Sequence, residues 1–294
     1  MPMNSPLHWV LWMLGAIAFF SLTAIAGKEA MHPSNVNAVG ISQLVFFRNV
    51  IGLVLVLMLV CRRYFKHEFA LDHGLLKFHI GRNVSHFIGQ WCWFYGLSLL
   101  TLAQVFAIEF TVPIWTAVFA SLLLSEKFTR YRILAILFGF IGVWVILRPG
   151  FVIVVDAAWV VLFSAIAYAL SHTLTKRLTG EVSVLSILFY MHIIQLPLAL
   201  ALVLFDFAWP QGITWFYIGC TAIAAIAAHY CMAKALTYGD AMLVMPMDFL
   251  RLPLIGVLGV LLYNETLDIW LLVGAGVMLM GNMLVLKNET VRGR

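Results

Sequence analysis

One apolar stretch of the chain, residues 78–99, carries a row of polar and ionisable side chains. The row comprises His79, Arg82, Asn83, His86 and Gln90. Their spacing of i, i+3, i+4, i+7 and i+11 places them on one face of an α-helix. In such apolar surroundings this face predicts a cavity wall, with Arg82 as a candidate cation for a substrate anion. Arg82 is also close enough to one end of the stretch to reach lipid headgroups. His86 and Gln90 lie deeper and are candidates for substrate binding.

Two carboxylates lie inside other apolar stretches: Glu109 near the middle of the fourth, and Asp248 within the ninth. Each is a candidate for binding a substrate amine or for carrying a coupling proton, because an ionisable group inside a membrane usually faces a cavity or a partner. The structural alternative for both is an ion pair. Asp248 can pair with Arg251, three residues later on the same helix face, and Glu109 can pair with Arg48 or Arg82.

Deep cations outnumber deep anions by one, because Arg48, Arg82 and Arg251 stand against Glu109 and Asp248. This balance favours a substrate with a carboxylate or phosphate, either anionic or amino-acid-like. An organic cation held by Glu109 over tryptophan faces is the alternative. The remaining candidates for substrate binding are Arg48, Arg251, Trp93, Tyr168 and Tyr190.

The elements that must position these residues are membrane-spanning helices. The 294-residue chain is 63% hydrophobic and 11% charged, with a mean hydropathy of +1.00, whereas a soluble domain carries roughly 25% charged residues. Ten apolar runs of about 20 residues are each long enough to cross the bilayer as a helix. The expected spans are 8–26, 36–60, 78–99, 101–124, 130–148, 156–175, 183–205, 212–235, 240–263 and 267–287. The predicted fold class is therefore an all-α polytopic membrane protein, with the lipid bilayer as its solvent.

The loops between these spans predict the topology. If both termini lie on one side, that side carries thirteen Lys and Arg residues, and the other side carries only Lys28 and Arg148. Basic loops stay in the cytoplasm, so we expect a multi-pass protein of the inner (cell) membrane with both termini cytoplasmic.

The two halves of the chain resemble each other. An offset of 139 residues aligns Glu109 with Asp248 and Glu126 with Glu265. The expected units are 1–149 and 150–294, each with five spans, and the odd number makes the second unit enter the membrane from the opposite face. This 5+5 inverted repeat is typical of carriers that work by alternating access. We expect Glu126 and Glu265 to be structural, each beside the start of the next helix at Thr129 or Asp268.

These motifs carry a family resemblance. An acid follows the fourth helix of each half, in Leu-Leu-Ser-Glu126-Lys-Phe and Leu-Tyr-Asn-Glu265-Thr-Leu. Residues 94–113 form the region between the third and fourth helices, and this region also carries the resemblance. The chain resembles the drug/metabolite transporter superfamily, EamA type, over essentially its whole length. The resemblance implies the ten-helix fold and a transport function. Family members move amino acids, nucleotide-like cofactors, vitamins, choline-like cations and drugs, so the resemblance leaves the substrate open.

The expected function is secondary-active transport of a small organic metabolite, driven by protons or by exchange. Glu109 and Asp248 are the candidate proton carriers. The alternatives are an organic-cation or drug exporter of the same fold, a channel, or a membrane assembly factor. HExxH, GxSxG and P-loop motifs are absent from the sequence, which argues against an enzyme, a metal site, a cofactor or an ATP-driven pump. Nucleic acid is not an expected partner. Glycines in spans five and ten permit close packing, either within the subunit or in a homodimer.

Overall fold

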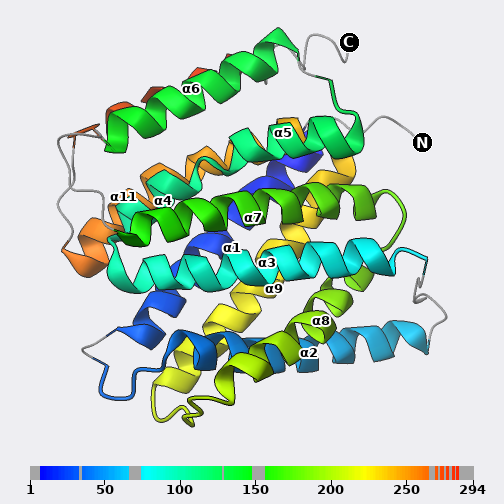
Figure 1. Ribbon diagram of the computed structural model, residues 1–294, viewed down its shortest axis with the longest axis vertical. Helices are drawn as coiled ribbons and strands as arrows, with labels where there is room; N and C mark the ends of the chain where they lie inside the picture. The colour runs from blue at the N-terminus through cyan, green and yellow to red at the C-terminus, as the bar shows by residue number, and fades with distance from the viewer. Residues whose placement is uncertain are drawn as a thin grey trace.

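The computed structural model describes residues 7–32, 35–65, 74–127, 129–147 and 156–264, with short stretches between 269 and 284. Every regular element in these ranges is helical, and Figure 1 shows a bundle of helices. The elements are α1 (Leu7–Met31), α2 (Ile41–Tyr64), α3 (Leu76–Leu99), α4 (Leu102–Glu109), α5 (Val112–Leu124), α6 (Arg130–Leu147), α7 (Asp156–Thr179), α8 (Val184–Val203), α9 (Thr214–Tyr238), α10 (Ala241–Val244), η1 (Met245–Leu250) and α11 (Arg251–Tyr263). Seven segments of the described chain are long and apolar enough to cross a membrane. The protein is thus an all-α, polytopic membrane protein, as predicted.

The first nine expected spans coincide with these helices to within a few residues, while the tenth is described only in short stretches. The fourth and ninth spans are not continuous α-helices. The fourth is divided into α4 and α5, and the ninth into α10, the 3-10 helix η1 and α11. Proline explains both breaks, because it lacks the N–H that would continue the helix. Pro113 stands in the first turn of α5 and Pro246 in the first turn of η1.

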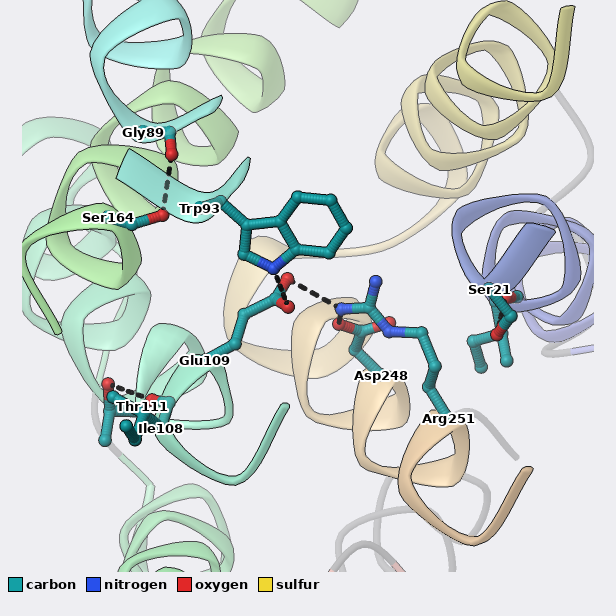
Figure 2. Close-up of polar contacts among 10 residues, drawn as sticks. Ser21, Gly89, Trp93, Ile108, Glu109, Thr111, Ser164, Asp248 and Arg251 are labelled. Carbon is teal, nitrogen blue, oxygen red and sulfur yellow. Dashed lines mark hydrogen bonds and ion pairs between the residues drawn. The ribbon is translucent and has the colours of Figure 1, made fainter. Parts of the chain in front are cut away.

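These breaks place the acidic side chains at interruptions in the middle of the spans. Glu109 is the last residue of α4, Asp248 lies in η1, and Arg251 is the first residue of α11. The Thr111 hydroxyl donates to the carbonyl of Ile108 at 2.9 Å, which satisfies one carbonyl at the break (Figure 2).

The helices pack in a pattern that pairs the two halves of the chain. In Figure 1, α3 runs beside α7, and α2 beside α8. The other extensive contact joins α1 to α9. If α1, α2 and α3 exchange with α7, α8 and α9, the α1–α9 contact becomes α7–α3, and α2–α8 maps onto itself. This is the pattern that the predicted repeat would produce, and the repeat stays a prediction.

Polarity is distributed as expected for a protein dissolved in lipid. Large apolar side chains such as Leu122, Trp144 and Trp159 are exposed on the outside. The interior contains ionisable side chains, including Arg48 and Arg82, which are only 3% and 1% exposed. Polar groups in membrane helices face the bundle interior, so the functional site must be sought between the helices.

Two sequence-based expectations about packing are corrected or resolved here. The Glu126 carboxylate accepts hydrogen bonds from the backbone N–H groups of Ala241 and Met242, at 2.9 and 3.1 Å. It therefore caps α10, and not the helix that follows it, while Glu265 lies outside the described residues. A Cβ on Gly139 would approach the Phe249 ring to 2.7 Å. This span-five glycine therefore packs within the subunit.

Candidate functional site

A pocket lies between the helices, and seven of the ten sequence-predicted site residues line it: Arg48, His86, Trp93, Glu109, Tyr168, Asp248 and Arg251. They come from α2, α3, α4, α7, η1 and α11. Further lining residues are Phe20 and Met13 of α1, His172 of α7, and His229 and Met232 of α9. Elements from both halves of the chain thus meet at one site.

The first part of the pocket is an ion-pair cluster around Arg251, which we call the Arg251 triad: Arg251, Glu109 and Asp248. The Arg251 guanidinium donates to Glu109 Oε1 at 2.8 Å and also pairs with Asp248. Trp93 Nε1–H donates to Glu109 Oε2 at 2.7 Å. Figure 2 shows these side chains converging from α3, α4 and the η1–α11 junction. Both oxygens of Glu109 therefore have partners.

Aromatic rings complete the surroundings of Arg251. Its guanidinium carbon lies 4.8 Å from the centroid of Phe106 and 5.4 Å from that of Phe20, within the range of cation–π attraction. Burying a charge is costly unless it is paired and hydrogen-bonded, and Arg251, only 3% exposed, meets both conditions. One acceptor and one donor of the triad are left over, because Asp248 Oδ1 and Arg251 Nε are buried and have no hydrogen-bond partner.

The second part of the pocket surrounds Arg48. Its guanidinium donates to Gln90 Oε1 at 3.1 Å and lies 5.9 Å from the centroid of Phe94. Arg48 Nε is buried without a hydrogen-bond partner, and no carboxylate of the described chain pairs with this cation. Arg48 is therefore a pocket cation whose charge is not neutralised by the protein around it.

A chain of hydrogen bonds runs beside Arg48 through two imidazoles. His86 Nε2 and His229 Nε2 are 3.0 Å apart, and the Gln195 side-chain amide lies 3.0 Å from His86 Nδ1. Ser164 ties α7 to α3 nearby, because its hydroxyl donates to the carbonyl of Gly89 at 2.7 Å (Figure 2). At Gly89 a Cβ would meet the Tyr168 ring at 3.0 Å, so the glycine lets Tyr168 lie against α3.

Three predicted site residues do not line the pocket. Gln90 is connected to the pocket by its hydrogen bond with Arg48. Arg82 is directed to neutral partners, Thr175 Oγ1 at 3.2 Å and Asn83 Oδ1 at 2.5 Å. Tyr190 stacks on His79 with ring centroids 4.1 Å apart. Without Arg82, the lining contains two arginines and two carboxylates, so the expected excess of one cation is not a property of the pocket.

The ion pairs differ in part from those expected. The Asp248–Arg251 pair is confirmed. Glu109 pairs with Arg251, and the expected pair with Arg48 or Arg82 is not formed. His229, His172 and Gln195 were not among the predicted site residues. His172 shares a face of α7 with Ser164 and Tyr168, a periodic pattern that could have indicated it, whereas His229 and Gln195 lie on mostly apolar helices without such a polar row.

Comparison with known proteins identifies the family of the chain. Residues 7–148 and 157–287 match the EamA-like transporter family. The chain belongs to this family. Like its relatives in the drug/metabolite transporter superfamily, this EamA-like protein is a membrane transporter for a small metabolite and not an enzyme.

Several relatives have named substrates. The EamA-like chain is 30% identical over 217 residues to a riboflavin transporter of Rhizobium johnstonii, covering 74% of this chain and 72% of the relative. It is 28% identical over 280 residues to a riboflavin transporter of Brucella anthropi, covering 91% and 96%. It is 23% identical over 211 residues to an S-adenosylmethionine uptake transporter of Rickettsia prowazekii, covering 72% of each. A crystal structure with 16% identity superposes with a TM-score of 0.75 over 95% of this chain and 96% of the other, which supports the fold.

Proposed function

We propose that this transporter carries an amino-acid-like or zwitterionic metabolite through the pocket by alternating access. The observation that carries this proposal is a pair of unsatisfied groups of opposite charge. Arg48 Nε–H is a buried donor without a partner, and Asp248 Oδ1 is a buried acceptor without a partner. Both residues line the pocket. A substrate carboxylate would satisfy the first and a substrate ammonium the second, since a buried polar group left unpaired is costly.

An organic cation at Glu109 is a weaker candidate. Both carboxylate oxygens of Glu109 are already bound, one to Arg251 and one to Trp93. A cation would have to displace a charge-assisted hydrogen bond that is buried in a low dielectric.

Riboflavin is the second candidate, because two relatives are named for it and one of them matches 91% of this chain. Riboflavin is a neutral, planar molecule whose ring carbonyls can accept a hydrogen bond from Arg48. The rings of Trp93, Tyr168 and Phe20, which line the pocket, can contact such a ring. S-adenosylmethionine combines both chemistries, because it is an amino acid attached to a planar heterocycle.

Alternating access requires the two halves of the bundle to move about the pocket. Interrupted helices at Pro113 and Pro246 place the Arg251 triad at the junction between the halves. The energy would come from an ion gradient or from exchange.

The distribution of Lys and Arg leads us to propose also an inner-membrane location with both termini cytoplasmic. Labelling of cysteines introduced at the termini, in intact cells, can test this topology. A homodimer through spans five and ten remains a proposal for cross-linking in membranes.

Counterflow in proteoliposomes tests the transport function. Vesicles are loaded with S-adenosylmethionine, riboflavin, an amino-acid mixture or choline, and uptake of the same labelled compound is followed. We expect saturable exchange of a zwitterionic compound, and a 10- to 100-fold loss in Arg48→Gln, because a hydrogen bond to a charged group contributes about 1.5–3 kcal/mol. Arg177→Gln, which removes an exposed cation paired with Glu181, is the matched control and should exchange normally.

Three outcomes would contradict the proposal. Exchange of riboflavin alone would favour the second candidate. Exchange of choline alone would favour the organic-cation carrier. Unsaturable flux, or no exchange of any compound, would favour a channel or an assembly factor.

A further inference from the structure

The proposed transport function assigns no role to the His86–His229 pair. His86 is 1% exposed and His229 is 4% exposed, and both line the pocket. Their Nε2 atoms, 3.0 Å apart, can approach so closely only if one carries a hydrogen and the other accepts it. In the neutral state one hydrogen therefore lies between the two Nε2 atoms. This hydrogen bond joins α3 to α9 across the two halves of the chain.

The hydrogen-bond chain gives each atom a role. Gln195 Nε2–H donates to His86 Nδ1 at 3.0 Å, so His86 carries its hydrogen on Nε2 and donates it to His229. His229 must then carry its own hydrogen on Nδ1, which is buried without a hydrogen-bond partner. This atom is a donor at the pocket with no acceptor supplied by the described chain.

The same chain of hydrogen bonds can accept one additional proton. Gln195 Oε1 is buried and has no hydrogen-bond partner. If the amide turns by 180°, this oxygen accepts from a protonated His86 Nδ1, while His86 Nε2–H continues to donate to His229. The rotation breaks the long hydrogen bond, 3.4 Å, from Gln195 Nε2 to the carbonyl of Asn83. An additional proton thus finds an acceptor without breaking the link between the imidazoles. Gln195 belongs to α8, so the rotation requires no movement of α3 or α9.

The charges around the pair are all positive or neutral. Arg48 of α2 and Arg82 of α3 act on both imidazoles. His172 of α7 also acts electrostatically on both imidazoles, and His192 of α8 acts on His229. Tyr168 of α7 lies 5.4 Å from the His86 ring, and Phe20 of α1 lies 5.1 Å from the His229 ring. The two carboxylates of the pocket, by contrast, are bound to Arg251.

This arrangement links a proton to a substrate anion. With the pocket empty, two guanidinium charges repel a third positive charge on the imidazoles. A substrate carboxylate at Arg48 would remove much of that repulsion, and a proton on the pair would in turn attract the carboxylate. Each ligand then raises the affinity for the other, which is the thermodynamic requirement for cotransport.

We propose that the His86–His229 pair binds the proton that is cotransported with the substrate, in place of Glu109 and Asp248. The proton enters from the side to which the pocket is open, resides on the imidazole pair with Gln195 as acceptor, and leaves with the substrate on the other side. No other bond is made or broken. This inference rests on the proposed carrier function.

The test separates exchange from coupling in the same proteoliposomes. Counterflow of S-adenosylmethionine with equal pH on both sides requires no net proton movement. Accumulation is then measured with the outside one pH unit more acidic, at a membrane potential clamped to zero. Wild type should accumulate S-adenosylmethionine up to about tenfold, because one proton moving down one pH unit corresponds to about 1.4 kcal/mol. His86→Gln and His229→Gln should lose the accumulation, whatever change in substrate affinity their counterflow shows.

His192→Gln is the matched control, because His192 bonds to Asn49 and not to the pair, and it should accumulate as wild type does. The proposal is overturned if His86→Gln or His229→Gln still accumulates tenfold, or if Glu109→Gln alone abolishes accumulation. If wild type exchanges none of the four loaded compounds in counterflow, before any gradient is applied, the carrier function itself is overturned.

A measurement on wild type covers the case in which both histidine variants fail to fold. S-adenosylmethionine is added to the detergent-solubilised protein in weakly buffered solution, and the pH is recorded. Uptake of about one proton for each bound molecule supports the proposal. Binding without proton uptake overturns it.

Discussion

The pocket contains two arginines in opposite situations. Arg251 has two carboxylate partners and two aromatic rings around it, whereas Arg48 has one neutral amide partner. The Nε of each arginine is buried without a hydrogen-bond partner. Both are 3% exposed, so burial does not distinguish them. The difference is charge compensation: the Arg251 triad has its partners within the protein, and Arg48 needs a partner from outside. The first arrangement joins helices from different halves, and the second is suited to binding a ligand.

The largest expected effect comes from removing the cation of the compensated region. Arg251→Met leaves Glu109 and Asp248 buried without their partner, which should destabilise the protein by about 3–5 kcal/mol. The measurement is thermal unfolding in detergent, followed by loss of the monodisperse peak. The triple variant Glu109→Gln/Asp248→Asn/Arg251→Met is the control and should be more stable than Arg251→Met. Equal or lower stability of the triple variant would contradict the account of the triad.

The second prediction concerns the uncompensated region. Arg48→Gln should leave the unfolding temperature unchanged or raised, because it removes a buried charge that has no counter-ion. Its 10- to 100-fold loss of exchange would then be a loss of binding, visible as a higher KM. A fall in stability as large as that of Arg251→Met would show that the two arginines do not differ in this way.

A smaller effect is expected from the donor that supports the triad. Trp93→Phe keeps a ring in place and removes the hydrogen bond to Glu109 Oε2, which should cost about 1–2 kcal/mol of stability. Thermal unfolding again reads the result. Trp91→Phe on the same helix is a control, since Trp91 Nε1 has no hydrogen-bond partner, and it should lose less.

The smallest effect should come from the amide that supports Arg48. Gln90→Met removes the acceptor of the 3.1 Å hydrogen bond and leaves Arg48 free to turn toward the substrate. We expect a change of a few-fold in KM, because a single neutral acceptor contributes about 0.5–1.5 kcal/mol, with little change in stability. Concentration-dependent counterflow measures it, and an effect as large as that of Arg48→Gln would contradict the minor role given to Gln90.

Local patterns predicted the fold and part of the site. The apolar runs indicated the membrane, and nine of them coincide with described helices, of which seven form segments long and apolar enough to cross it. The i, i+3 spacing predicted the Asp248–Arg251 pair. Pro113 and Pro246 marked the breaks beside which both acids lie. Partners on separate helices were predicted less well: Glu109 was expected to bind Arg48 or Arg82, and Glu126 to cap its neighbouring helix. In both cases the actual partner is more than 100 residues away, Arg251 by 142 and Ala241 by 115.

The membrane fold and the burial of the polar row on α3 follow from composition and periodicity, because the bilayer requires apolar segments of fixed length and hides polar faces. Those requirements act on each helix separately. Whether Arg48 or Arg251 keeps a carboxylate depends on which helix faces meet, and so does the meeting of His86 with His229. Helical period places a side chain on a face and contains no information about the face opposite. The packing of α3 against α7, and of α1 against α9, therefore separated the compensated cation from the one left for a substrate.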